Sequence, residues 1–81
     1  MKTDLVNVQA LPGYRLQVEL ADGRRGQVDV SPWLGAPGMS RLRDADYFAQ
    51  VSILLGAATW PDGEDIAPDT LASALQAMQP A

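Results

Sequence analysis

The chain has 81 residues, 47% of them hydrophobic and 20% charged, and it contains neither cysteine nor histidine. These absences exclude disulfides, thiolate nucleophiles, imidazole bases and the usual zinc ligands. Ten acids against six bases give a net charge of -4, which disfavours direct binding to nucleic acid because phosphate contacts need a basic surface. The length, and the absence of any linker-like or repeated segment, predict a single domain over residues 1–81.

Hydropathy also limits the possible locations of the protein. No apolar run approaches the roughly 20 residues that a membrane span requires. The first residues lack the charged, apolar and small-residue order of a secretory signal. We therefore expect a cytoplasmic protein with no membrane partner.

Residues 14–30 show the alternation of apolar and polar side chains that is typical of half-buried strands. Two strands separated by Asp22-Gly23 predict a hairpin. A two-residue loop would break the apolar face, whereas a three-residue loop over 21–23, with Gly23 left-handed in a bulge, keeps that face continuous. The cross-strand pairs that follow are Leu16 with Val28, Tyr14 with Val30, Arg15 with Asp29 and Glu19 with Arg25.

A strand over residues 5–10 precedes this hairpin, with Val6 and Val8 expected to face the core. It would join the hairpin through a turn at Pro12-Gly13. The predicted sheet is therefore a three-stranded meander.

The middle of the chain predicts short helices followed by a second hairpin. Ser31 would cap one helical turn over residues 31–34, and Asp44 would cap a short helix through Gln50. Strands over residues 51–55 and 57–60 would then pair around a turn at Gly56.

The last segment predicts a turn and a C-terminal helix. Pro61-Asp62-Gly63 has the residues of a tight turn, and Pro68 suits the first position of a helix. This helix would cover the sheet with a stripe of Leu71, Leu75 and Met78, and Pro80 would end it. Together the elements predict an α+β fold, consisting of a small antiparallel sheet with a second hairpin, a short middle helix and a C-terminal helix.

The acidic stretch 60–69 is the candidate site for chemistry, because alternating acids in a glycine-containing loop can bind calcium or magnesium. Its spacing does not match the twelve-residue calcium loop. The competing structural interpretation gives Asp62 to the turn and Asp69 to the helix start, and leaves Glu64 in solvent. On that interpretation only Glu64, and to a lesser degree Asp62, lack a structural task.

Catalytic groups are not apparent. Serines without an activating histidine are weak nucleophiles, and carboxylates in an exposed glycine turn have no reason to hold a proton near neutrality. We therefore expect no enzymatic activity, no catalytic residues and no cofactor or metal.

Candidate interaction residues are drawn from exposed charges and from tryptophan, which is enriched in protein interfaces. Trp60 is expected to fill the core, and Trp33 is the better interface candidate. The full candidate set is Trp33, Arg41, Arg43, Asp62 and Glu64.

Three parts of the chain resemble a widespread bacterial domain family of unknown function. They are the hairpin around Asp22-Gly23, the segment containing Leu42 and Phe48, and the ending that runs from Trp60 to Leu71. The resemblance covers nearly the whole chain and implies an α+β fold without catalytic residues. It also implies that some relatives are fused to a helix-turn-helix domain, and that others are encoded beside a small toxin-like partner.

The leading hypothesis is accordingly a non-enzymatic protein-binding or regulatory module, an antitoxin-like partner of a neighbouring small protein. The alternative is a small-ligand or weak divalent-cation-binding domain that uses the loop 60–69. A homodimer through exposed sheet edges is a third hypothesis.

Overall fold

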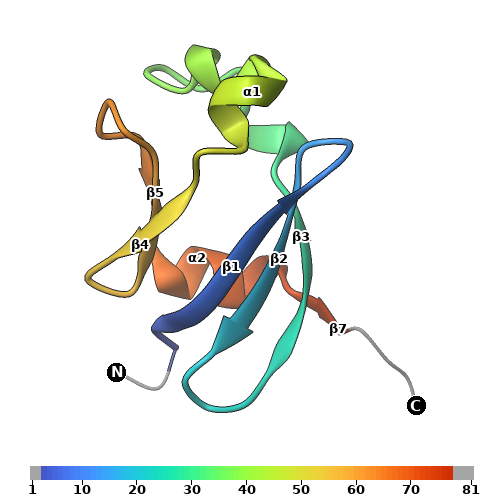
Figure 1. Cartoon of the computed structure of the whole chain (residues 1–81). Helices are drawn as coiled ribbons and strands as arrows, with labels where there is room; N and C mark the ends of the chain where they lie inside the picture. Colours follow the sequence, from blue (N-terminus) through green and yellow to red (C-terminus); the bar gives the residue numbers. More distant parts are fainter. Residues whose placement is uncertain (1–2, 78–81) are drawn as a thin grey trace.

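The computed structural model describes residues 3–77 and has the predicted α+β fold, with two antiparallel sheets ordered β1-β2-β3-β7 and β4-β5-β6. Figure 1 shows the larger sheet beside the β4–β5 hairpin, with α1 at one end of the molecule. The strands are β1 (Leu5–Leu11), β2 (Arg15–Leu20), β3 (Arg25–Asp29), β4 (Ser52–Leu54), β5 (Ala57–Thr59), β6 (Asp65–Ile66) and β7 (Gln76–Ala77). The helices are the 3-10 turns η1 (Ser31–Trp33) and η2 (Ser40–Arg43) and the α-helices α1 (Ala45–Phe48) and α2 (Pro68–Ala74).

The β2–β3 hairpin confirms the predicted register. Its loop is Ala21-Asp22-Gly23, closed by a bond from the Gly23 amide to the Leu20 carbonyl at 2.9 Å, and Gly23 has a φ of 94°. Only a residue without a side chain adopts such a φ readily, so the sequence of the loop determines the alignment of both strands. The pairs of β2 with β3 include Arg15 with Asp29, Leu16 with Val28 and Glu19 with Arg25.

Strand β1 is present, but the predicted inward orientation of Val6 is wrong. The register with β2 shifts between Leu5 and Asn7, and this β-bulge leaves Val6 without a direct partner and 56% exposed. Leu5 is buried instead, and Val8 packs against the core as predicted. The extra residue lets Leu5 and Val8 reach the same face although they are three positions apart.

The short helices differ in detail from the prediction. Ser31 does not cap η1. It lies inside the turn, and its amide and hydroxyl both donate to the Asp29 carboxylate. Asp44 does cap α1, accepting from the Asp46 amide at 2.9 Å, but the helix ends at Phe48 rather than at Gln50. The turn η2 was not predicted.

The second hairpin is confirmed and continues into a third strand. The turn at Leu55-Gly56 joins β4 to β5, and β6 pairs with the other side of β5. Trp60 directly follows β5 and is 1% exposed, which confirms the prediction that it fills the core. Its Nε1 donates to the Phe48 carbonyl at 2.9 Å. That bond satisfies the one polar atom of the indole ring in the buried position.

Helix α2 begins at Pro68 as predicted but ends six residues before Pro80. The backbone of Leu75 is extended, and Gln76–Ala77 then pairs with β3 as strand β7. Leu71 is fully buried, whereas the predicted stripe partner Leu75 lies beyond the helix end. Met78 and Pro80 lie outside the described residues. Strand pairing at the edge of β3 therefore overrides the helical pattern in this segment.

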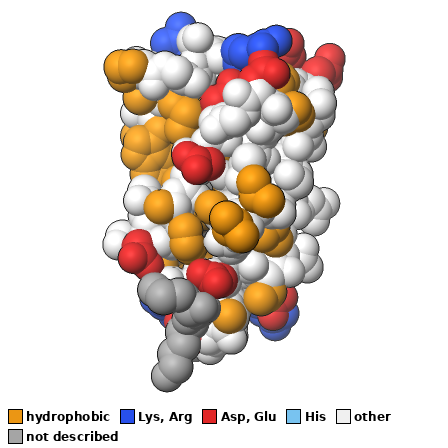
Figure 2. Space-filling view, turned by 90° about the vertical axis from the view of Figure 1, so that its left-hand side faces the viewer, with side chains coloured by type: hydrophobic (Ala, Val, Ile, Leu, Met, Phe, Trp, Pro, Cys, Tyr) orange, Lys and Arg blue, Asp and Glu red, His pale blue; other side chains and the backbone are white. Residues whose placement is uncertain are grey.

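One core joins the two sheets and α2. Its members come from the larger sheet, from the smaller sheet and from the helices, and include Leu16, Val28, Leu42, Phe48, Ala58, Trp60 and Leu71. No helix within residues 3–77 is long and apolar enough to cross a membrane. Figure 2 views the side of the β4–β5 hairpin, where several hydrophobic side chains lie on the surface. Among the exposed large hydrophobic residues, Ile53, Leu54 and Leu55 belong to this hairpin.

Candidate protein-binding surface

The structure brings three of the predicted interaction residues together around a residue that was not predicted. Arg41 of η2 forms a salt bridge with Asp62 of the turn after β5. The hydroxyl of Tyr47, on α1, donates to the Glu64 carboxylate at 2.5 Å and accepts from the Asp62 amide at 2.8 Å. We call Arg41, Tyr47, Asp62 and Glu64 the Tyr47 cluster.

This cluster corrects the expectation that Glu64 and Asp62 have no structural task. Glu64 is partly buried and holds a phenol hydroxyl, and its carbonyl accepts from the Trp60 amide at 2.9 Å. Asp62 is bound through both its amide and its carboxylate. The sequence carries no local signal for the contacts of Tyr47 with Glu64 and Asp62, because they join segments that lie 15 or more positions apart.

The electrostatics of the cluster are centred on Tyr47. Desolvation, followed by the hydrogen bond to Glu64 and the charge of Glu64, raises the Tyr47 pKa from 10.0 to about 12. The Arg41 guanidinium lies over the tyrosine ring, 5.1 Å from its centroid, and opposes this shift. The phenol therefore remains a neutral hydrogen-bond donor throughout the physiological pH range.

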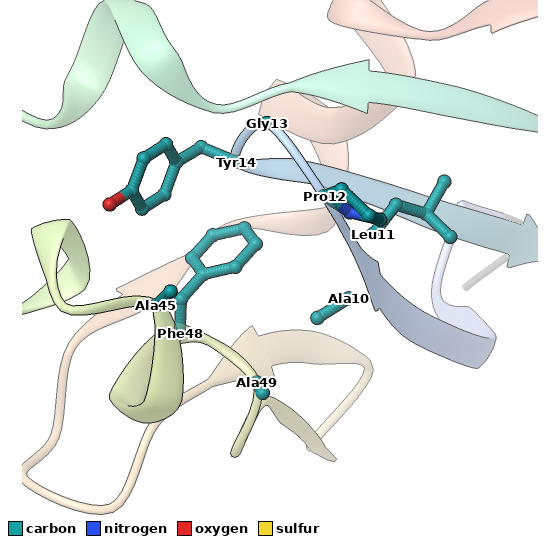
Figure 3. A pocket seen from close by; sticks show the side chains of 8 residues that line it. All are labelled: Ala10, Leu11, Pro12, Gly13, Tyr14, Ala45, Phe48 and Ala49. Carbon is teal, nitrogen blue, oxygen red and sulfur yellow. The ribbon is translucent and has the colours of Figure 1, made fainter.

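The other side of α1 faces an apolar pocket of about 250 Å³. Figure 3 shows the rings of Tyr14 and Phe48 on one side of this pocket and the short side chains of Ala10, Ala45 and Ala49 around it. Alanine and glycine at these positions leave the space that larger side chains would fill. The lining residues are Ala10, Leu11, Pro12, Gly13, Tyr14, Ala45, Phe48 and Ala49.

Tyr14 forms the aromatic wall of the pocket in an unusual backbone conformation. It was predicted at the start of a strand, and its carbonyl does accept from the Val30 amide at 2.9 Å, yet the residue lies in the turn with a φ of 60°. A tyrosine in the left-handed region is uncommon and needs support from its surroundings. The support comes from edge-to-face contact with Phe48 at 5.4 Å and from the hydroxyl, which donates to the Arg43 carbonyl.

The two remaining predicted residues lie near these features. Arg43 is exposed and is tied to the pocket by its carbonyl contact with Tyr14. Trp33 is half-buried in η1 and packs against the core, so its indole offers only part of its surface to a partner. The Tyr47 cluster and the pocket therefore share α1, and Arg43 adjoins the pocket at its Tyr14 wall.

The acids of the stretch 60–69 do not converge. Asp62 faces Arg41, Glu64 faces Tyr47, and Asp69 accepts from the Thr3 hydroxyl at 2.8 Å. Within the described part of the chain, no three acidic side chains are grouped so that they could hold a metal ion.

Comparison with known proteins identifies the family of this chain. A search of curated proteins and a search of solved structures each find no significant match. A family model described as "protein of unknown function (DUF2442)" matches residues 5–76, a range that contains both the pocket and the Tyr47 cluster. The chain therefore belongs to this family of domains of unknown function.

Proposed function

We propose that this protein is a non-enzymatic protein-binding module and that the pocket with its polar surroundings is the binding surface. The pocket supports this proposal most directly. Protein interfaces combine a desolvated apolar centre, into which an anchor side chain inserts, with a polar rim. Here an apolar hollow lined by Tyr14 and Phe48 lies beside the charged Tyr47 cluster and Arg43.

The size of the pocket favours a side chain over a metabolite. Ligand pockets for drug-sized molecules measure about 300–1,000 Å³. At about 250 Å³ this hollow suits one large apolar side chain of a partner. The arginines and acids around it would then select the partner by charge and fix its orientation.

The proposed partner is a neighbouring small protein, in an arrangement similar to an antitoxin and its toxin. The family-level resemblance supports this idea. The net charge of -4 also favours a partner that is basic overall, because opposite charge speeds association.

Co-purification from the native host with a pocket-filling variant tests the proposal. Ala45→Phe would occupy the pocket, whereas Ala21→Phe places the same ring in the exposed β2–β3 loop as a matched control. We expect wild type and Ala21→Phe to retain the same partner. Ala45→Phe should weaken binding by about thirtyfold or more in calorimetry with the purified partner, the size of a lost anchor residue.

Thermal unfolding of each variant would verify that the fold is intact. A protein recovered alone from its host, or a partner held equally by Ala45→Phe and Ala21→Phe, would contradict the proposal. Stabilisation of wild type by small apolar compounds in a thermal-shift screen, abolished by Ala45→Phe, would instead identify a small-ligand site.

A further inference from the structure

The outer face of the larger sheet carries a regular pattern of polar residues. Gln9, Gln17 and Gln27 lie in direct register across β1, β2 and β3. We call Gln9, Gln17 and Gln27 the glutamine row. Oppositely charged pairs flank it on both sides, with Arg15 beside Asp29 on one side and Glu19 beside Arg25 on the other.

Strand alternation places these side chains away from the core. Leu16, Val18 and Val28 are at most 2% exposed and point inward. Gln17 lies between Leu16 and Val18, and Gln27 precedes Val28, so both glutamines point outward. The three glutamines of the row and the four charged residues are all partly or fully exposed. Within the described part of the chain, neither Arg15 nor Glu19 forms a salt bridge, although hydrogen bonds from Ser31 to the Asp29 carboxylate and, to a lesser degree, the Arg15 charge lower the pKa of Asp29.

The charges on this face are complementary to themselves under a two-fold rotation. A two-fold axis along the glutamine row places each strand of one copy opposite the same strand of the other copy. It also places the Arg15–Asp29 pair of one copy opposite the Glu19–Arg25 pair of the other. Arg15 of one protomer then faces Glu19 of the partner subunit, and Asp29 faces Arg25 of the partner subunit. Each glutamine meets a glutamine, and a primary amide can donate to and accept from its own kind.

We propose that two copies of this chain associate face to face through the outer surface of the β1–β2–β3 sheet, with the two-fold axis along the glutamine row. Stacked sheets lie about 10 Å apart, a separation that arginine and glutamate side chains can bridge. A hollow of about 150 Å³ among Asn7, Gln9, Gln17, Glu19 and Arg25 provides room for the partner's side chains. The contact is isologous, as in most homodimers, and it differs from pairing at a sheet edge.

Reversing one charge on this face tests the proposal, and mixing two such variants should restore the contact. Arg15→Glu would place glutamate opposite Glu19 of the partner subunit, and Glu19→Arg would place arginine opposite Arg15 of the partner subunit, so each variant alone meets like charges. In an equimolar mixture, both inter-subunit contacts become attractive again. Sedimentation equilibrium across concentration should show dimerisation of each variant weakened by about tenfold or more, and restored on mixing.

Controls separate this arrangement from general charge effects. Arg43→Glu and Asp65→Arg change the net charge equally but lie outside the face, and they should leave dimerisation unchanged. Raising salt from 0.1 to 1 M should weaken the wild-type dimer, because the screening length falls from about 10 to about 3 Å. Thermal unfolding would show that Arg15→Glu and Glu19→Arg remain folded.

Three outcomes would overturn the proposal. They are a wild-type chain that stays monomeric at millimolar concentration, variants that dimerise like wild type, and a mixture no more associated than its components. Variants that dimerise like wild type at any salt concentration would point to edge pairing instead.

Discussion

Tyr47 shows how one side chain can connect distant segments. From its position in the sequence it is only an apolar residue of a short helix, yet its hydroxyl contacts both Glu64 and the backbone of Asp62. The salt bridge of Arg41 with Asp62 adds little energy by itself, because both side chains are well exposed, and such pairs contribute about 0–1 kcal/mol. Tyr47 is therefore the residue that fixes the turn after β5 against α1.

Alkaline titration should reveal this role. The folded Tyr47 pKa of about 12 exceeds its ordinary value of 10.0, so the contact stabilises the fold fully below pH 10 and is lost as pH rises through 12. Glu64→Gln removes the charge that favours the neutral phenol and should lower the Tyr47 pKa toward 10.0. Tyrosinate absorbance in a Tyr14→Phe background measures this change for Tyr47 alone.

The neighbouring acid Asp65 provides the control, because its side chain is exposed and it is not among the groups that shift the Tyr47 pKa. Asp65→Asn should leave the titration unchanged. A wild-type Tyr47 that ionises near its ordinary value would show that the bond to Glu64 is absent in solution.

Replacing either of two glycines with alanine has a conformational cost in unfolding free energy, but only one of the two replacements also has a steric cost. Gly13 and Gly56 both have a φ of 81°, but an added Cβ at Gly13 meets nothing within 4 Å, whereas at Gly56 it comes within 2.6 Å of the Asp4 side chain. Gly13→Ala should cost about 1 kcal/mol for its left-handed backbone. Gly56→Ala should cost about 1–3 kcal/mol more, because Asp4 must move.

Urea unfolding of both variants measures this difference directly. Equal losses of unfolding free energy would mean that the junction of β1 with the β4–β5 turn, where the Leu5 amide donates to the Gly56 carbonyl, opens easily.

At the scale of elements, the sequence predicted those whose information is local. The β2–β3 register followed from the alternation of Leu16 and Val18 and from the position of Gly23, and the structure reproduces it. Asp44 and Pro68 likewise marked helix starts through their own chemistry. These signals each depend on a few adjacent residues.

The errors occurred where tertiary contacts decide the structure. The bulge at Val6 depends on the alignment of β1 with β2, and alternation alone cannot reveal it. Strands β6 and β7 have two residues each, too few to show a period. The candidate site was predicted only as separate residues, because the pairing of Arg41 with Asp62 and the small side chains around the pocket come together through the fold.

For the whole molecule, the shared core predicts a single cooperative transition. Trp60 directly follows β5 of the smaller sheet, but it packs with core residues of the larger sheet, and its ring centroid lies 5.8 Å from that of Phe48 in α1. In a Trp33→Phe background, Trp60 fluorescence and far-ultraviolet circular dichroism should therefore give coincident unfolding curves. A fluorescence change at a lower denaturant concentration would show that the smaller sheet unfolds independently.

The β-bulge in β1 has a consequence for behaviour at high concentration. β1 is the outer strand of its sheet, and an exposed outer strand is the usual template for amyloid-type aggregation. Its Leu5 amide already donates to the Gly56 carbonyl. At Val6 the backbone leaves the regular hydrogen-bonding repeat, so an approaching chain finds a continuous ladder only along residues 7–11. We therefore expect the extra residue that places Leu5 in the core also to limit fibre growth along this edge of the protein.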